Sequence, residues 1–339
     1  MLSMEKRLLV SSVGKAESKL VRLLAALALI ALIARSAAAD TLRLGYSGAT
    51  ASQLAGALAV EQKLFELYGV TVELNQSAGL TMIRAVESGS LDVAIVGGGQ
   101  ALAAYAKGAD VRIVSGLVNT VPFQLWAKPD IAQLGDLKGR LIADTPPGTS
   151  LNLGTRIMLA RAGLNPARDV KLVAFGRLQL VPRSLLGGVV DAALLSAPET
   201  LEARKLGLHM LLDMAAERIP CLFTSVVTSR AVLEKSPAAL ERFLKALLHG
   251  VKLALTNPDM AKKSLGRTLR LTDRDALDET YRQSAAAYEP MPFVKRDALE
   301  TVAKIAAEKS VRDPYDVVDM SILERIDKEG FIKTLYAKP

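Results

Sequence analysis

Two stretches of the sequence match each other at a constant offset of 99 residues, RAVESGSLDVAIVG at 84–97 and RSLLGGVVDAALLS at 183–196. The matched pairs are Arg84 with Arg183, Gly89 with Gly188, and Asp92 with Asp191. Glycine suits the left-handed residue that ends a helix, and aspartate suits the start of a strand. Two similar turns could have converged here, but one repeated helix–strand unit explains more of the chain.

The pattern around both stretches alternates short strands with helices. In the first unit, strands are predicted at 41–45, at VTVEL (70–74) and at LDVAIV (91–96), with helical patterns between them. The same order of strand, glycine loop, helix, glycine and strand returns over 139–175. Such alternation is typical of parallel crossovers in an α/β sheet. Two units therefore predict an α/β protein with two lobes.

Two further segments are predicted to connect the lobes. VPFQLWAKPD (121–130) is typical of a strand ended by proline, and CLFTSVVTS (221–229) of a returning strand. Beyond it the chain is mostly helical, and this tail is expected to pack on the first lobe. The predicted boundaries are 40–126 and 227–339 for lobe I and 127–226 for lobe II. The hinge strands are expected at Gln124–Lys128 and Ser225–Thr228, and the last helices at 273–288, 297–309 and 320–329.

The N-terminus carries a 12-residue apolar run at 23–34. As a helix it would be about 18 Å long, which is short against the roughly 30 Å hydrocarbon core of a bilayer. Basic residues precede the run and SAAAD follows it, a layout typical of a secretory signal cleaved after Ala39. We expect 1–39 to be a signal peptide and the mature chain to begin at Asp40, without a lipid anchor because no cysteine follows the run. Arg35, close to the cleavage position, leaves a membrane anchor as the alternative.

Charge and composition exclude several classes of function. Residues 1–39 hold six basic and two acidic side chains, so the mature chain has 37 Lys and Arg against 33 Asp and Glu, and its net charge falls from +8 to +4. That is too weak for nucleic-acid binding. The single cysteine, Cys221, cannot form an intramolecular disulfide, and His209 and His249 form no Cys/His cluster. We expect no metal site and no cofactor.

Several segments resemble the substrate-binding proteins of nitrate, sulfonate and taurine ABC importers, a group related to proteins that handle the pyrimidine precursor of thiamine. They lie within 41–260 and include LRLGYSG, VESGSLDVAIVGGGQALAAYAKGADVRIV, LGDLKGRLIADTPPGTS and GGVVDAALLSAPE. The resemblance implies a bilobal periplasmic-binding-protein fold of type II, with two α/β lobes joined by two hinge strands. It also implies a ligand in the cleft, a periplasmic location, and an ABC permease and ATPase in the inner membrane as partners.

The glycines of DVAIVGGGQ (92–100) raise the alternative of a dinucleotide-binding loop. That fingerprint would need a third glycine where Leu102 stands, an acid near Asn119, and a place after the first strand rather than the third. We therefore expect these glycines to bring backbone N–H groups close to a ligand beyond the carboxyl end of the strand, where the helix dipole adds positive potential.

Four predicted strand ends have this small, polar composition, two in each lobe. They are expected to line one cleft from both sides, and hinge closure would bring their donors onto the ligand. Taken singly, each loop is equally well explained as a capped turn. The candidate residues are Ser47 and Gly48, then Gly98, Gly99 and Gln100, then Gly148, Thr149 and Ser150, and last Ser196 to Glu199.

Three single residues have two interpretations each. Arg177 either clamps a carboxylate or sulfonate or is a solvated loop residue. Trp126 either walls the cleft or packs in a core. Glu199 either faces the cleft, where it would repel an anion or accept a hydrogen bond from an amine, or faces outward in the first turn of a helix. The small neutral loop YSGATASQ (46–53) leaves a neutral or aromatic ligand open beside an anion.

The predicted function is that of a monomeric periplasmic solute-binding component of an ABC importer, which captures a small organic solute and catalyses no reaction. A periplasmic ligand sensor for a membrane receptor, or an enzyme on the same fold, are the alternatives. Neighbouring genes for an ATPase and a permease would favour import, and a neighbouring receptor kinase would favour sensing.

Cell fractionation tests the predicted signal peptide. Expressed at full length in a Gram-negative host, the protein should be recovered from the soluble periplasm, and N-terminal sequencing should begin at or near Asp40. A full-length form retained in the membrane would contradict the prediction.

Overall fold

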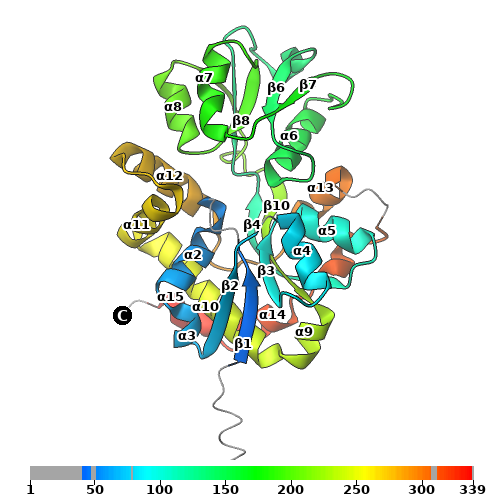
Figure 1. Cartoon of the computed structure of the whole chain (residues 1–339), viewed down its shortest axis with the longest axis vertical. Helices are drawn as coiled ribbons and strands as arrows, with labels where there is room; N and C mark the ends of the chain where they lie inside the picture. The colour runs from blue at the N-terminus through cyan, green and yellow to red at the C-terminus, as the bar shows by residue number, and fades with distance from the viewer. Residues whose placement is uncertain (1–39, 47–50, 78, 307–310, 338–339) are drawn as a thin grey trace, which may run out of the picture. The chain divides into compact units, whose positions relative to one another are not determined.

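The described strands form two mixed sheets of five strands each, in the orders β2-β1-β3-β10-β4 and β7-β6-β8-β5-β9 (Figure 1). The computed structural model describes residues 40–46, 51–77, 79–306 and 311–337. Backbone contacts group Thr41–Pro339 into one unit. The predicted α/β class is confirmed.

The two sheets repeat one arrangement. In the first sheet β1 and β3 are parallel, and β10 is antiparallel to both of its neighbours. In the second sheet β6 is parallel to β7 and β8, and β5 is antiparallel to β8 and β9. The strands of the first sheet are β1 (Asp40–Gly45), β2 (Val70–Asn75), β3 (Val93–Val96), β4 (Val111–Thr120) and β10 (Pro220–Ser229). Those of the second are β5 (Gln124–Ala127), β6 (Leu141–Asp144), β7 (Lys171–Ala174), β8 (Ala192–Leu195) and β9 (His209–Asp213).

Helices pack around both sheets (Figure 1). We call the first sheet with its helices the first lobe, and the second sheet with its helices the second lobe. The helices of the first lobe are η1 (Ala51–Gln53), α2 (Leu54–Glu61), α3 (Leu64–Leu67), α4 (Gly79–Glu87), α5 (Gly98–Ala106), α9 (Arg230–Lys235), α10 (Pro237–Thr256), α11 (Pro258–Leu269), α12 (Arg274–Ala287), α13 (Arg296–Ala306), η4 (Pro314–Val317), α14 (Ser321–Lys328) and α15 (Phe331–Tyr336). Those of the second are η2 (Leu134–Leu137), α6 (Ser150–Arg161), η3 (Leu178–Leu180), α7 (Val181–Leu186) and α8 (Glu199–Lys205).

The helical tail packs on the first lobe, as predicted. Helix α10 lies on α2 and α3, α13 lies on β10, and α14 contacts β4. The apolar stripe of α10 is buried in this core, where Phe243 stacks on Phe65 with 5.0 Å between ring centroids. The expected helices at 273–288, 297–309 and 320–329 correspond to α12, α13 and α14.

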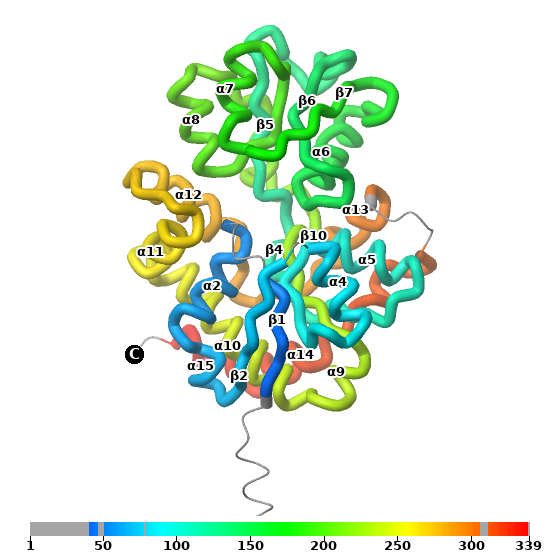
Figure 2. The backbone as a smooth tube through the Cα atoms, viewed as in Figure 1, coloured from blue at the N-terminus to red at the C-terminus, as the bar shows by residue number. Residues whose placement is uncertain are grey.

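Two backbone segments connect the sheets (Figure 2). The chain passes from β4 to β5 through residues 121–123 and returns from β9 to β10 through 214–219. The predicted boundaries at 126/127 and 226/227 instead fall inside β5 and β10. Each expected hinge strand lies within one sheet, because its backbone groups are paired there. Movement of the lobes as separate bodies stays a prediction.

The matched glycines end their helices in the same way. Gly89 and Gly188 both have a φ of +73°, which is the left-handed conformation expected from their positions. Each lies three residues before the matched aspartate, and the strand then begins with Val93 or Ala192. The repeat inferred from the sequence is therefore present in the backbone.

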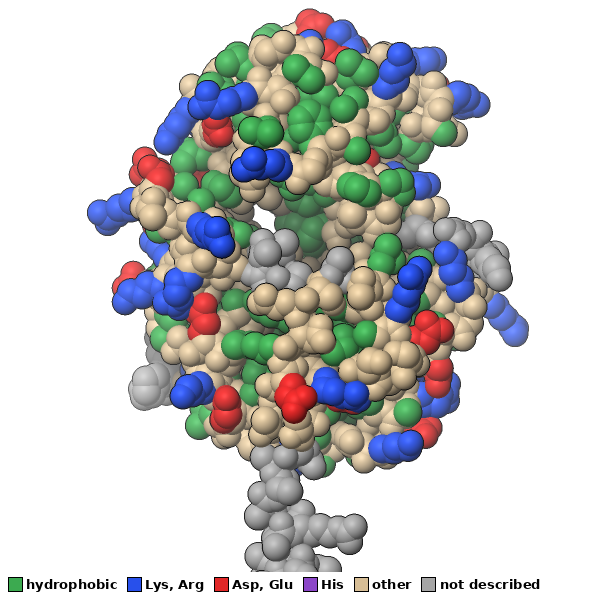
Figure 3. Space-filling model, in the orientation of Figure 1, with side chains coloured by type: hydrophobic (Ala, Val, Ile, Leu, Met, Phe, Trp, Pro, Cys, Tyr) green, Lys and Arg blue, Asp and Glu red, His purple; other side chains and the backbone are tan. Residues whose placement is uncertain are grey.

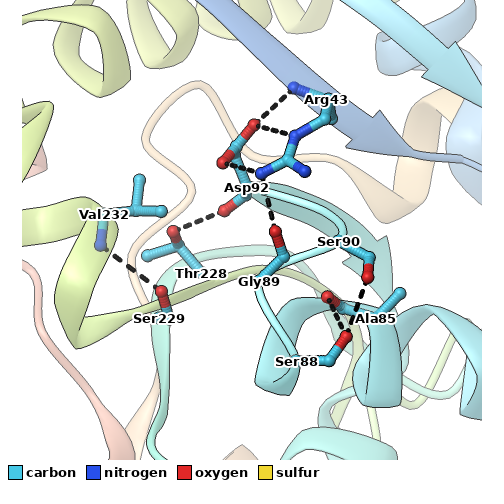
Figure 4. A network of polar contacts seen from close by, with 9 residues as sticks. All are labelled: Arg43, Ala85, Ser88, Gly89, Ser90, Asp92, Thr228, Ser229 and Val232. Atoms are coloured by element: carbon cyan, nitrogen blue, oxygen red, sulfur yellow. Dashed lines mark hydrogen bonds and ion pairs between the residues drawn. The ribbon is translucent and has the colours of Figure 1, made fainter.

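The matched aspartates join neighbouring parallel strands. Asp92 accepts the backbone N–H of Arg43 at 2.8 Å, and the Arg43 guanidinium donates to both carboxylate oxygens at 2.9 and 2.8 Å (Figure 4). Asp191 accepts the backbone N–H of Leu141 at 2.9 Å and Lys128 Nζ at 2.7 Å. Burial alone would raise the pKa of each carboxyl, but these hydrogen bonds bring both pKa values below the usual range.

The Asp92 site also joins the returning strand. Figure 4 shows Thr228 of β10 beside Asp92, and its Oγ1 donates to the Asp92 carbonyl at 2.7 Å. The Arg43 guanidinium also donates to the Gly89 carbonyl at 2.7 Å. Arg43 and Asp92 together thus tie the end of α4 and the strands β1, β3 and β10 to one another.

Replacing this aspartate should destabilise the fold. We expect Asp92→Ala to lower the free energy of unfolding by about 1–3 kcal/mol, because the half-exposed Arg43 loses a charged partner. Since the native pKa of Asp92 is lowered, the difference from the parent should be complete above about pH 4 and vanish as the pH falls through the native pKa.

Denaturant unfolding across that pH range measures the difference. Asp110→Ala is the matched control, since Asp110 is exposed beside Arg112 and Arg230 and should change stability by no more than about 0.5 kcal/mol. Equal losses in the two variants would contradict the assigned role of Asp92.

Candidate functional site

A cavity of about 590 Å³ lies between the two lobes. The surface is hollowed there, and hydrophobic side chains are visible inside the hollow (Figure 3). Its volume is in the range of small-molecule sites. Residues of both lobes and of the first connecting segment line it, which agrees with the predicted cleft between two α/β units.

The second lobe contributes the segments that follow three parallel strands. Thr145 and Pro146 follow β6, Phe175 follows β7, and Ser196 and Ala197 follow β8. The first lobe contributes the end of β3, the start of α5, the segment at 51–53 and one side of α12. Ligands bind at the carboxyl ends of parallel strands in open α/β sheets, and the cavity occupies that position in both lobes.

Four of the predicted site residues line the cavity, and the others lie elsewhere. Ser47 and Gly48 are outside the described residues. The lining residues are Gln100, Thr149, Ser150 and Ser196, together with Gly97 and Ala197 from the same predicted loops. Among the described candidates, those outside the cavity wall are Gly98, Gly99, Trp126, Gly148, Arg177 and Glu199.

Gly98 serves helix packing. A Cβ at this position would lie 2.5 Å from Leu222 Cγ and 2.6 Å from the Leu222 carbonyl oxygen, so the start of α5 packs directly on β10. Gly99 is buried within the same helix. Gly98 is therefore required by the strand next to it, and the approach of its backbone N–H to a ligand stays a prediction.

Trp126 packs in the core of the second lobe. Its side chain is 3% exposed, lies among Val181, Leu185 and Leu195, and donates from Nε1 to Gln124 Oε1 at 3.2 Å. β5 is an interior strand of its sheet, with β8 on one side and β9 on the other, so its large side chain is covered. Of the two interpretations left open by the sequence, packing is the one found.

The remaining candidates lie at the edge of the cavity. Arg177 is exposed and directly precedes η3, while its neighbours Gly176 and Leu178 line the wall. Glu199 is half-buried as the first residue of α8, and burial raises the pKa of its carboxyl. Gly148 is exposed with a φ of +85°. Its carbonyl accepts a hydrogen bond from Gln100.

Gln100 joins the two lobes. Its Oε1 accepts the N–H of Gly97 at 3.3 Å, and its Nε2 donates to the Gly148 carbonyl at 3.2 Å. The lobes are close here, because a Cβ on Gly97 would lie 2.8 Å from Ser150 Oγ. The amide thus caps α5 and contacts the opposite loop at the same time.

A buried carboxylate fixes the loop after β6. Asp144 is 2% exposed and accepts Asn152 Nδ2 at 2.6 Å and Thr155 Oγ1 at 3.0 Å. Burial raises the pKa of its carboxyl, and these hydrogen bonds oppose the rise. Thr149 caps α6 by accepting the Asn152 N–H at 3.3 Å. These contacts hold the N-terminus of α6 at the cavity wall.

Helix α12 was not expected at the site. Gln283 accepts the Ala197 N–H at 2.8 Å through Oε1 and donates from Nε2 to Thr200 Oγ1 at 3.1 Å. Glu279, which is 7% exposed, pairs with Arg204 of the second lobe at 3.5 Å. The sequence predicted this helix, but nothing in its pattern of polar residues indicated that the helix contacts the second lobe.

Three phenylalanines in the wall were also missed. Phe123 of the connecting segment and Phe223 of β10 meet edge to face, with 5.3 Å between ring centroids and 82° between ring planes. Phe175 adds a half-buried ring from the second lobe. Isolated aromatics in apolar runs look like core residues, so the sequence could not distinguish them.

The described residues hold no group of three His, Cys, Asp or Glu side chains suited to a metal ion. Cys221 is fully buried, and burial raises the pKa of its thiol to about 12. Within the same part of the chain, no helix combines the length and apolar character needed to cross a membrane. The predicted signal peptide, 1–39, lies outside the described residues.

A protein-family model described as NMT1/THI5 like matches residues 53–261. The chain belongs to this family. The match confirms the family resemblance inferred from the sequence, since it spans the two crossing segments and most of both sheets. No curated protein matches the chain.

Solved structures share the fold of this NMT1/THI5-like protein. A protein from Bordetella bronchiseptica RB50 is 20% identical, with a TM-score of 0.71 over 86% of this chain and 98% of that one. The aliphatic sulphonate-binding protein SsuA from Escherichia coli is 20% identical, with a TM-score of 0.62 over 88% and 92%. The nitrate-binding protein NrtA from Synechocystis PCC 6803 is 13% identical, with a TM-score of 0.61 over 86% and 89%. The predicted periplasmic-binding-protein fold is confirmed.

The packing role of Gly98 can be tested by adding one methyl group. We expect Gly98→Ala to lower the free energy of unfolding by about 1–3 kcal/mol, because the new Cβ would overlap Leu222 and its carbonyl. Gly135→Ala is the control, since a Cβ there has no atom within 4 Å. Thermal unfolding of both variants measures the effect, and equal stability would remove this role from Gly98.

Proposed function

We propose that this protein is the periplasmic solute-binding component of an ABC importer and captures a small organic molecule in the cavity between its lobes. One observation carries the proposal: the cavity is walled by the carboxyl ends of parallel strands from two equivalent sheets. A site divided in this way is completed only when both lobes meet. The family match and the fold shared with SsuA and NrtA support it.

The contacts between the lobes suit a reversible closure. Gln100 with Gly148 and Gln283 with Ala197 are neutral hydrogen bonds, each worth about 0.5–1.5 kcal/mol. The ion pair of Arg204 with Glu279 joins an exposed arginine to a buried carboxylate. Such contacts are individually weak, so a ligand that touches both lobes can shift the balance between open and closed forms. The connections at 121–123 and 214–219 are the segments about which we propose the lobes move.

The protein binds its ligand without converting it. Its cysteine is buried away from the cavity wall with a pKa raised to about 12, and the described lining residues include no histidine, cysteine or carboxylate. We propose that 1–39 direct export, that the mature chain acts as a monomer, and that it delivers the ligand to a permease and ATPase in the inner membrane.

Native mass spectrometry of protein purified from its own host's periplasm tests the proposal. The expected result is a retained small molecule of one mass, present at one copy per chain. Returned to stripped protein, that molecule should raise the melting temperature and lower the radius of gyration measured by scattering.

Ser196→Phe should abolish retention, because the ring fills the cavity from the end of β8. Ser88→Phe places the same ring on an exposed residue after α4 and should retain the molecule. A protein that retains nothing from its host's periplasm, or a ligand kept by both variants, would contradict binding in this cavity.

A further inference from the structure

The wall of the cavity carries no formal charge. None of its lining residues in the described part of the chain is Asp, Glu, Lys, Arg or His. Any charge on a ligand would therefore have to be balanced by dipoles alone.

Each of those dipoles is weak taken singly. The N-terminus of one helix favours an anion by about two- to fivefold, and the helices that begin at Ala51, Gly79, Gly98 and Ser150 present such ends at the wall. Gln100 and Thr149 already accept one N–H each at the starts of α5 and α6. Removing an unpaired ion from water disfavours binding by several powers of ten. The balance favours a molecule without charge.

The polar atoms of α12 point to the same conclusion. Thr280 Oγ1 donates to the Ala276 carbonyl at 2.6 Å, and Ser284 Oγ donates to the Thr280 carbonyl at 2.6 Å. A hydroxyl that has donated its one proton offers a ligand only acceptor lone pairs. Both amide protons of Gln283 are likewise engaged, by Thr200 and Glu279. This side of the cavity therefore suits a ligand that donates hydrogen bonds and disfavours one that only accepts them.

The apolar part of the wall is suited to a ring. Phe123 comes from the first connecting segment, Phe223 from β10 of the first lobe, and Phe175 from the second lobe. Met82, Ile95 and Leu151 continue this surface on both sides. Aromatic side chains prefer edge-to-face or offset contacts with a ring, and here both lobes supply them.

We propose that the ligand is an uncharged aromatic molecule carrying at least one hydrogen-bond donor, such as an amide, a phenol or an N–H heterocycle. The inference rests on the proposed binding function and narrows it: the ring contacts the phenylalanines, and the donor faces the hydroxyl of Ser284. A sulfonate or nitrate ion would find no positively charged side chain among the described residues of this wall.

Isothermal calorimetry with matched probes tests the inference on the purified, ligand-stripped protein. The probes are 2-naphthamide, 2-naphthol, indole and benzamide, with naphthalene-2-sulfonate, benzoate and 2-naphthylmethylammonium as charged counterparts, and methanesulfonate and nitrate as anions without a ring. At least one neutral probe should bind at least tenfold tighter than its charged counterparts, and the ringless anions should not bind.

Two variants test the position of the ring. Phe175→Leu should weaken binding of the best neutral probe by about two- to tenfold, because it keeps the apolar volume and removes the aromatic face. Phe331→Leu is the matched control, since Phe331 is half-buried beside Tyr68 and Lys245 in the first lobe. This variant should bind the probe with the affinity of the parent protein. Equal melting temperatures establish that both variants fold.

The outcomes separate this inference from the proposed function. A charged probe that binds as tightly as its neutral counterpart, an anion without a ring that binds, or a panel in which nothing binds overturns the uncharged aromatic class. Retention of one host molecule in native mass spectrometry would still support the binding function in each of those cases. Equal loss in Phe175→Leu and Phe331→Leu would contradict a ring against Phe175.

Discussion

Each sheet is completed by a strand that the chain supplies only after it has passed between the lobes. β5 lies between β8 and β9, and β10 lies between β3 and β4. Interior strands pair their backbone groups on both sides, so neither sheet can be closed without its crossing segment. This constraint fixes the two connections beside each other and places the carboxyl ends of both sets of parallel strands at one gap. The cavity follows from that arrangement.

Several polar residues at these strand ends form hydrogen bonds within the protein and so hold the walls of the cavity in place. Asp144 and Thr149 hold the start of α6, Gln100 caps α5 and contacts Gly148, and Gln283 contacts the loop after β8. Once these groups have found partners within the protein, the surface left for a ligand is dominated by phenylalanine rings and aliphatic side chains. The solved structures that share this fold include sulphonate- and nitrate-binding proteins, whereas none of the described residues that line the cavity here has a charged side chain.

The repeat at an offset of 99 residues was visible because it has local causes. Gly89 and Gly188 end helices with the same φ, and Asp92 and Asp191 bind the backbone of the neighbouring strand in the same way. Short-range conformational and hydrogen-bonding preferences produce these features, so residue type and spacing reveal them. The same reasoning placed α12, α13 and α14 and identified three of the loops at the cavity.

What the sequence by itself determined is the alternation of strands and helices, the duplication, the family and the set of loops at the strand ends, because each depends on residues close together in the chain. Only the tertiary structure decided which side chains face the cavity. Gly98 packs on Leu222, Trp126 packs on the second sheet, and α12 brings Gln283 to Ala197, 86 residues away in the sequence. Contacts of that kind depend on how whole elements pack against one another, so a local pattern of residue types does not predict them.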